Sequence, residues 1–303
     1  MARQLSIVGL GEALVDILPD RQVLGGAPLN VAVHAHQLAS PLGGRGVVVS
    51  RIGQDDLGRD VMADVTARGM DGGYIQTDPD RPTGRVYVGL DDRGEPSFEI
   101  VRNVAWDWLQ FDPDLADLAS SCDAVCFGSL AQREAQSRNT IRRFLTAADH
   151  AVRLFDVNLR QDYFDRQILM RSCEQATAVK LNDSELPVVT KTIGLDGGDA
   201  DAQIQSMLKR FGLRLVALTR GQRGTVLYTA SGRYEHDAVT YPPADGADAI
   251  GAGDACSAGL LVGMLLRWPI ERTLDLANHA GAFVASQPGA TPRLPEAVLA
   301  MVK

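Results

Sequence analysis

The chain has 303 residues, of which 45% are hydrophobic and 22% are charged, and its formal net charge at pH 7 is −8. This composition indicates a globular protein with a sizeable core and excludes a disordered chain. The negative balance argues against a nucleic-acid-binding surface, which needs clustered Lys and Arg, although backbone amides can still hold the phosphates of a nucleotide. The four cysteines lack zinc-site spacing, and no segment approaches the roughly 20 apolar residues of a membrane span. We therefore expect a cytoplasmic protein with neither a nucleic-acid nor a membrane partner.

The N-terminal part of the chain predicts two short strands and a helix that follows a glycine turn. Residues 5–10 are an apolar run typical of a buried strand, and residues 14–18 predict a second strand whose apolar side is interrupted by Asp16. An acid at such a position commonly lies on the wet face, so a structural role and a ligand-binding role both stay open. A glycine pair then opens the backbone, and Asn30 can present both a donor and an acceptor near the start of the helix.

Two strand-like runs further along have no helix between them. Residues 83–90 and 95–101 are joined by the hairpin sequence Asp-Asp-Arg-Gly at 91–94. Together with the second strand of the chain they predict a small separate sheet. We expect this sheet to form a lid over a cleft, built from about residues 13–24 and 83–103.

The rest of the chain alternates strands with helices. The predicted strands span residues 46–52, 124–127, 152–157, 178–181 and 213–219, and the predicted helices end near residue 68 or span 113–119, 134–147, 166–175 and 200–211. This pattern predicts an α/β fold in which helices cover both faces of a mostly parallel sheet, with a ligand crevice at the carboxyl ends of the strands. An antiparallel hairpin at 225–229 and 232–237 would close the sheet edge. We expect one domain, residues 1–303.

Polar side chains follow three consecutive strands of this predicted sheet. They are Asp156, Asn158 and Arg160 after the first strand, Asn182 and Glu185 after the second, and residues 219–224 after the third. A neutral oxygen and a carboxylate three residues apart suit a magnesium ion that keeps most of its waters, and they equally suit a helix cap with an acid in the first turn. The glycines of 219–224 could lie against a nucleotide or simply connect two strands.

The sequence Asp-Ala-Ile-Gly-Ala-Gly-Asp at 248–254, followed by an apolar helix to Leu266, is the stretch with the most specific chemistry. Its small residues let a tight turn aim several backbone N–H groups and a helix dipole at one point, which is an anion site. Asp254 at the rim of that site would deprotonate an attacking hydroxyl, and the pairing indicates phosphoryl transfer. An ordinary tight turn with Asp254 as a helix cap is the competing interpretation.

Five motifs in this order resemble the ribokinase-like (PfkB) sugar kinases over nearly the whole chain. They are Gly-Gly-Ala-Pro-Leu-Asn-Val-Ala at 25, Asp-Val-Asn-Leu-Arg at 156, Asn-Asp-Ser-Glu at 182, Thr-Arg-Gly-Gln-Arg-Gly at 219 and the stretch at 248–254. The motif at 156 resembles fructokinase-like members. Neither a Walker P-loop nor a dinucleotide-binding Gly-x-Gly-x-x-Gly is present.

The resemblance implies a role for each matching position. The implied catalytic set is Asp254 as base, with the amides of Gly251, Ala252 and Gly253 as the anion hole. The implied sugar-binding set is Asp16, Gly25, Gly26, Asn30, Arg102 and Arg160. The implied ATP-binding set is Asn182, Glu185, Thr219, Gly221, Gly224 and Asn278, with Glu185 acting on Mg²⁺ through water. A monovalent cation, with K⁺ as the candidate, is implied at Asp248 and the carbonyls of Ile250 and residues 287–290, an inference weakened by Ala249 in place of the family's usual Thr.

These roles predict an ATP-dependent sugar kinase, with fructose as the expected substrate. The alternatives are a 2-keto-3-deoxygluconate kinase, a ribokinase or a nucleoside kinase of the same family, and a non-catalytic sugar-binding regulator. A regulator has no need of the base Asp254, so the sequence favours an enzyme. A homodimer formed through the lid sheet is a further hypothesis.

Overall fold

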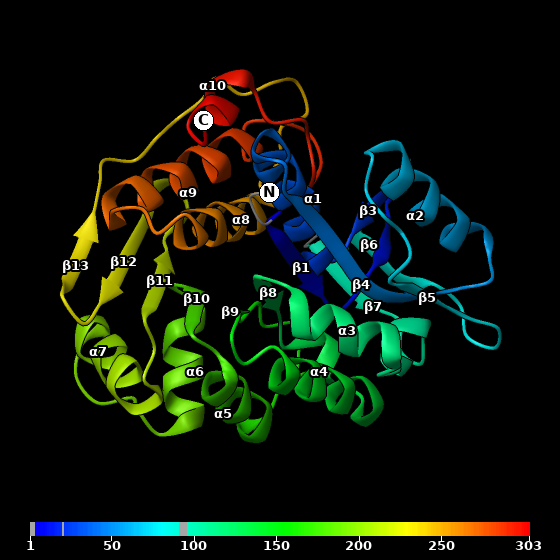
Figure 1. The fold of residues 1–303 in the computed structure, drawn as a ribbon, viewed down its shortest axis with the longest axis horizontal. Helices are drawn as coiled ribbons and strands as arrows, with labels where there is room; N and C mark the ends of the chain where they lie inside the picture. Colours follow the sequence, from blue (N-terminus) through cyan, green and yellow to red (C-terminus); the bar gives the residue numbers. More distant parts are fainter. Residues whose placement is uncertain (1–3, 20, 91–95) are drawn as a thin grey trace.

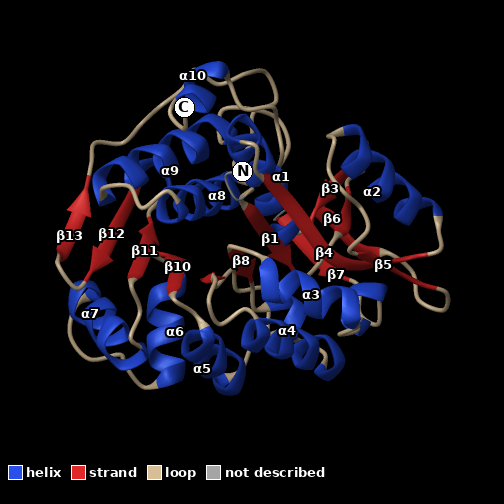
Figure 2. Ribbon diagram, viewed as in Figure 1, coloured by secondary structure: helices blue, strands red, loops and turns tan. Residues whose placement is uncertain are grey.

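The computed structural model describes residues 4–19, 21–90 and 96–303. In that part of the chain it shows an α/β fold built on a nine-stranded sheet (Figure 1, Figure 2). From edge to edge the strands are β13 (Gly232–Glu235), β12 (Thr225–Thr229), β11 (Leu215–Thr219), β10 (Ala178–Asn182), β9 (Val152–Asp156), β8 (Ala124–Phe127), β1 (Ser6–Leu10), β4 (Arg45–Gly53) and β5 (Ile75–Asp78). Neighbours from β11 to β5 pair in parallel, and β12 and β13 are antiparallel. The predicted fold class and the closing hairpin are confirmed.

A second, four-stranded sheet lies beside the first in the described part of the chain. Its order is β3 (Gln22–Gly25), β2 (Leu14–Ile17), β6 (Gly84–Leu90) and β7 (Pro96–Ile100). The pair β6 and β7 is antiparallel, as the hairpin pattern predicts, and β2 joins β6 in parallel. The predicted turn at 91–94 lies outside the described residues, and β3 was not predicted.

Helices cover both faces of the large sheet (Figure 1). They are α1 (Ala27–Ala39), α2 (Asp56–Ala67), α3 (Pro113–Ser121), α4 (Ala135–Ala147), α5 (Arg166–Gln175), α6 (Glu185–Ile193), α7 (Ala200–Phe211), α8 (Ala252–Leu265), α9 (Ile270–Val284) and α10 (Glu296–Ala300). Short 3-10 turns lie at η1 (Ser40–Leu42), η2 (Ala105–Trp108), η3 (Leu130–Gln132) and η4 (Gly221–Arg223). None of the helices in the described residues is long and apolar enough to cross a membrane. The sequence did not predict α6, α9 or α10.

The two faces of the sheet carry separate apolar cores. Along β8, Val125 and Phe127 belong to the core that includes α3 to α7, whereas Ala124 and Cys126 belong to the core that includes α1, α8 and α9. This alternation is the period-2 pattern of a strand that is buried on both sides. The buried helix α8 contacts both α1 and α9.

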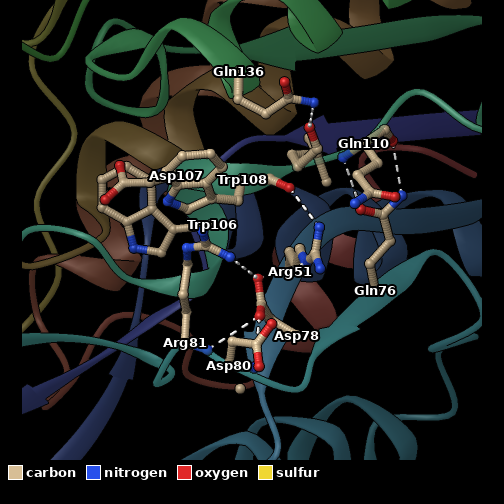
Figure 3. A network of polar contacts seen from close by, with 12 residues as sticks. Arg51, Gln76, Asp78, Asp80, Arg81, Trp106, Asp107, Trp108, Gln110 and Gln136 are labelled. Carbon is tan, nitrogen blue, oxygen red and sulfur yellow. Dashed lines mark hydrogen bonds and ion pairs between the residues drawn. The ribbon is translucent and has the colours of Figure 1, made fainter.

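A polar network joins β4, β5 and η2 at the edge of the large sheet where the chain leads toward β6 (Figure 3). The guanidinium of Arg51 on β4 lies 3.1 Å from a carboxylate oxygen of Asp78 on β5, and it donates to the carbonyl of Trp108 at 2.6 Å. At the start of α2, the capping carboxylate of Asp55 accepts from the backbone N–H of Thr83 at 2.8 Å. The first two contacts hold η2 (Ala105–Trp108) against the edge of the large sheet, and the last holds the residue before β6 against the start of α2.

Helix α1 packs on β1 and β4 with no space for side chains between the backbones. A Cβ atom on Gly46 would lie 1.9 Å from the carbonyl oxygen of Ala32, and one on Gly9 would lie 1.9 Å from the carbonyl oxygen of Pro28. Real Cβ atoms never approach so closely. The helix therefore depends on glycine at both positions.

We expect the Gly46→Ala substitution to lower the free energy of unfolding by about 2–3 kcal/mol, because α1 must move away from β4. Gly197→Ala is the matched control, since a Cβ there meets open space, and its effect should stay within about 0.5 kcal/mol. Urea unfolding of both variants measures the difference. Equal losses at the two positions would contradict the close-contact explanation.

Candidate active site

The first turn of α8 lies against the loop that precedes α10. Gly251 caps the helix with φ at 78°, and a Cβ atom there would lie 2.1 Å from the carbonyl oxygen of Ala290. Ala252 donates its N–H to the carbonyl of Ala249 at 3.3 Å, so this amide of the predicted anion hole already has a partner. The N–H groups of Gly253 and Asp254 have no acceptor within the helix, because they belong to its first turn.

Asp254 is not the cap of this helix, so the competing interpretation of the sequence is wrong. Its carboxylate instead accepts from Nδ2 of Asn30 at 2.8 Å, across 224 residues of sequence. Burial first, and the charge of Asp156 second, raise the pKa of Asp254 to about 6, while the bond from Asn30 opposes the rise. Asp254 is therefore a partly buried carboxylate whose pKa is raised toward neutral pH.

Asp16 lies beside the glycine pair, as the motif predicts. A Cβ atom on Gly25 would lie 2.8 Å from Oδ2 of Asp16, and one on Gly26, whose φ is 108°, would lie 2.4 Å from the carbonyl oxygen of Glu12. Both glycines are therefore required by close contact. Burial raises the pKa of Asp16 to about 6, and the charge of Arg160 opposes that rise.

Glu12 is a site residue that the sequence reasoning missed. Its side chain is only 2% exposed, and its Oε2 has no hydrogen-bond partner among the described residues. Burial raises the pKa of Glu12 to about 7, the charge of Asp254 adds to the rise, and the charge of Arg160 opposes it. Its position directly after β1, at the carboxyl edge of the sheet, is the signal that could have found it.

Lys180 is the second residue that was missed. It lies in the middle of the apolar strand β10, and its Nζ donates to both carboxylate oxygens of Asp156, at 2.7 and 2.8 Å. Burial, the largest single effect, lowers the pKa of Lys180, but the charges of Asp156, Cys256 and Asp254 and the bond to Asp156 together exceed it, and the net shift is upward. A lysine inside an apolar strand could have been recognised from the sequence, because a buried ammonium group requires a polar or charged partner.

Asn182 and Glu185 form the local capping arrangement that was one of their two interpretations. Oδ1 of Asn182 accepts from the N–H groups of Ser184 and Glu185 at 2.9 Å, and Oε2 of Glu185 accepts from the N–H of Asn182 at 2.9 Å. The other carboxylate oxygen of Glu185 accepts from the N–H of Leu159 at 2.8 Å. Burial raises the pKa of Glu185, and these backbone bonds offset only part of the rise.

The predicted nucleotide-side residues gather at one edge of the sheet. Thr219 at the end of β11 pairs in register with Asn182 on β10, and η4 follows it directly. Gly221 and Gly224 have φ angles of 57° and 73°, which favour glycine. A Cβ atom on Gly224 would lie 3.6 Å from Nδ2 of Asn278, and that nitrogen is buried without a partner in the described part of the chain.

Two predicted residues make contacts that their implied roles do not use. Arg102 is exposed, and its guanidinium donates to the hydroxyl of Tyr163 at 3.2 Å and lies 3.8 Å from Asp162. Asp248 accepts from the N–H of Ile250 at 3.0 Å and from the N–H of Gly289 at 3.1 Å. Among residues 4–19, 21–90 and 96–303, no group of three or more His, Cys, Asp and Glu side chains could hold a metal ion.

Residues 18–297 match the pfkB family of carbohydrate kinases, and the chain belongs to this family. The protein is therefore an ATP-dependent sugar kinase. Its relatives include a fructokinase of Salmonella typhimurium, which is 31% identical over 309 residues that cover 94% of this chain and 95% of that protein.

Solved structures of fructokinases share the fold over nearly the whole chain. One from Xylella fastidiosa with bound ATP has a TM-score of 0.85 at 25% identity, covering 98% of each chain. A double mutant from Vibrio cholerae, bound to fructose, ADP and a potassium ion, has a TM-score of 0.81 at 27% identity, covering 99% of each chain.

The buried acid Glu12 predicts a pH-dependent stability. Folded Glu12 keeps its proton up to about pH 7, whereas its ordinary pKa is 4.5. The folded state binds more protons than the unfolded state between these values, so the free energy of unfolding contributed by Glu12 falls as pH rises through that window. We expect Glu12→Gln, which stays neutral, to raise the free energy of unfolding by about 2–3 kcal/mol at pH 8 and to leave it nearly unchanged near pH 4.

Urea unfolding at pH 4, 6 and 8 measures this effect. Glu271→Gln on the exposed surface of α9 removes the same charge and serves as the control, with no comparable gain at pH 8. A Glu12→Gln protein that is less stable at every pH would show that the carboxylate is stabilised in the fold.

Proposed function

We propose that this kinase transfers the γ-phosphoryl group of ATP to a hydroxyl of fructose, with Asp254 as the general base. The observation that carries the proposal is the partly buried Asp254 carboxylate, which Asn30 holds in the first turn of α8. The N–H groups and the positive end of the helix dipole would stabilise the moving phosphoryl charge, and Asp254 would take the proton of the attacking hydroxyl.

The charges of the cleft favour a neutral sugar over a sugar acid. Glu12, Asp16 and Asp254 are three carboxyl groups, and Arg160 is the cation whose charge bears on all three. A carboxylate ligand would have to compete with them for one exposed guanidinium, whereas sugar hydroxyls can donate to each. Fructokinase relatives, and the solved fructokinase that binds fructose, support the same choice.

The nucleotide would lie at the opposite end of the cleft. Its site would be formed by the loop after β11 and by Asn278, whose buried Nδ2 has no hydrogen-bond acceptor among the described residues. Both carboxylate oxygens of Glu185 accept backbone bonds, so this residue would act on Mg²⁺ only through coordinated water. A K⁺ ion at Asp248 and the carbonyl of Ile250 would serve to hold the turn before α8.

The small sheet would act as the lid of the sugar site. Asp16 lies on its strand β2, and Thr83, the residue before its strand β6, accepts from the N–H of Gly53 at the end of β4 at 2.9 Å. The polar network at Arg51 and Asp78 lies at the neighbouring edge of the large sheet (Figure 3). Closure over the sugar would exclude water from the phosphoryl group. A homodimer formed through the outer face of this sheet remains part of the proposal.

We expect Asp254→Asn to lower kcat for fructose by at least about a hundredfold, because a general base contributes on the order of 10² to 10⁴ in rate. The amide keeps the shape of the carboxylate, so the affinity for ATP should change far less. Steady-state kinetics and ATP titration measure the two effects. Turnover near that of the unmodified enzyme would remove Asp254 from the mechanism.

The substrate itself is tested by an ATP-coupled assay over fructose, 2-keto-3-deoxygluconate, ribose, adenosine and aminoimidazole riboside. A site that hydrogen-bonds particular hydroxyls rejects analogues that lack them by several kcal/mol, so we expect fructose to exceed the others in kcat/KM by about a hundredfold or more. If the sugar acid is preferred, and Arg102→Ala abolishes its use selectively, the fructose assignment is wrong although the kinase assignment stands.

A further inference from the structure

A buried ion pair lies directly beneath the first turn of α8. Nζ of Lys180 on β10 bonds both oxygens of Asp156 on β9, and the two side chains are 8% and 5% exposed. The parallel register of β9 and β10 places the two residues side by side. A Cβ atom on Gly253 would lie 3.4 Å from Nζ of Lys180, so the ammonium group is in contact with the turn that carries Asp254.

Ser257 connects this pair to the helix. Its buried hydroxyl donates to Oδ2 of Asp156 at 2.8 Å and lies 3.1 Å from the carbonyl oxygen of Gly253, one turn earlier in α8. Three elements, β9, β10 and α8, therefore meet through one set of polar bonds. An apolar contact could fill this space at lower desolvation cost, because burying two charges is expensive even when they are paired.

The two members of the pair act on Asp254 in opposite directions. The charge of Asp156 raises the pKa of Asp254, and the charge of Lys180 lowers it. While both are present, the charge of Lys180 offsets part of the larger effect of Asp156. Loss of either one would leave a single buried charge close to the reacting carboxylate, where the low dielectric strengthens its effect.

We propose that Lys180 and Asp156 are a positioning pair, which holds the first turn of α8 through Ser257 and sets the electrostatic environment of Asp254. The inference rests on the proposed function only in that Asp254 is the base. Neither member touches the reacting atoms in this arrangement. Their role is to keep Asp254 aligned with the N–H groups of the helix in a fixed electrostatic environment.

Three other groups affect the pKa of Asp254, and their contributions can be separated from the contribution of the pair. Asn30 on α1 donates to the carboxylate, Arg160 after β9 lowers its pKa, and Glu12 after β1 is electrostatically coupled to it. None of these is altered when the pair is changed. The pH dependence of the enzyme is thus a direct readout of the pair.

The experiment is a charge cycle in the full-length enzyme. The variants are Lys180→Met, Asp156→Asn and the double variant with both changes, and the measurement is kcat/KM for fructose between pH 5 and 9. We expect the acid limb, which reports the free enzyme's base, to move up by about 0.5 to 1 pH unit in Lys180→Met and down by a similar amount in Asp156→Asn. In the double variant it should return to within about 0.3 unit of the unmodified enzyme, as expected for coupled residues.

A matched control separates this effect from damage to the fold. Arg51→Met breaks another buried ion pair, with Asp78, whose members contact neither α8 nor Asp254 (Figure 3). It should lower thermal stability without moving the acid limb. If Lys180→Met is too unstable to assay, Asp156→Asn and the double variant still give different expectations, because the acid limb should move down in the first and return to the unmodified position in the second.

The failure of the inference differs from the failure of the proposed function. If the unmodified protein phosphorylates none of the sugars tested, the function is wrong. A carboxyl-carbon NMR titration of Asp254 in the same variants then still measures whether the pair sets its pKa. Acid limbs that coincide in all three variants, with turnover reduced uniformly, would show that the pair is only structural and overturn the inference.

Discussion

The geometry of the candidate site depends on the packing of α8. This helix is apolar on every side and lies buried in contact with α1 and α9. A Cβ atom on Gly259 would lie 2.8 Å from Cα of Ala277 on α9, and one on Gly251 would overlap the backbone at Ala290. These close backbone contacts, one at the start of α8 and one at its middle, restrict where the helix can lie. Asp254 is therefore placed by helix packing rather than by a flexible loop, and its N–H neighbours are fixed with it.

The same packing explains why the site holds acids in an unfavourable environment. Burial raises the pKa values of Glu12, Asp16 and Asp254, so each carboxylate is less stable here than in water. Ionised groups of this kind lower the stability of the empty fold, which makes these three residues candidates for a functional role. Sugar hydroxyls would supply the donors that these groups lack, and the free energy lost on folding would be recovered on binding.

The sequence alone predicted those elements of the fold that a few consecutive residues define. Regular alternation of strands and helices identified the parallel sheet, and the turn pattern identified the hairpin of β12 and β13. Strand β3 was missed because four residues beside a glycine pair are defined only by their pairing with β2. Helix α9 was missed because Asn278 and Gly281 weaken its intrinsic helix propensity, and packing against α8 stabilises it instead.

The site shows the same division between local and long-range information. Glycine motifs and the acid after them could be read directly, whereas Lys180 acquires its meaning only from the register that places Asp156 beside it. Glu185 combines local and long-range information, because its two carboxylate oxygens bond different segments of the chain. One carboxylate oxygen closes the local cap at Asn182, and the other holds the N–H of Leu159, the residue before Arg160. Through this single side chain the loop after β9 is tied to the start of α6, and the two segments are held in one arrangement.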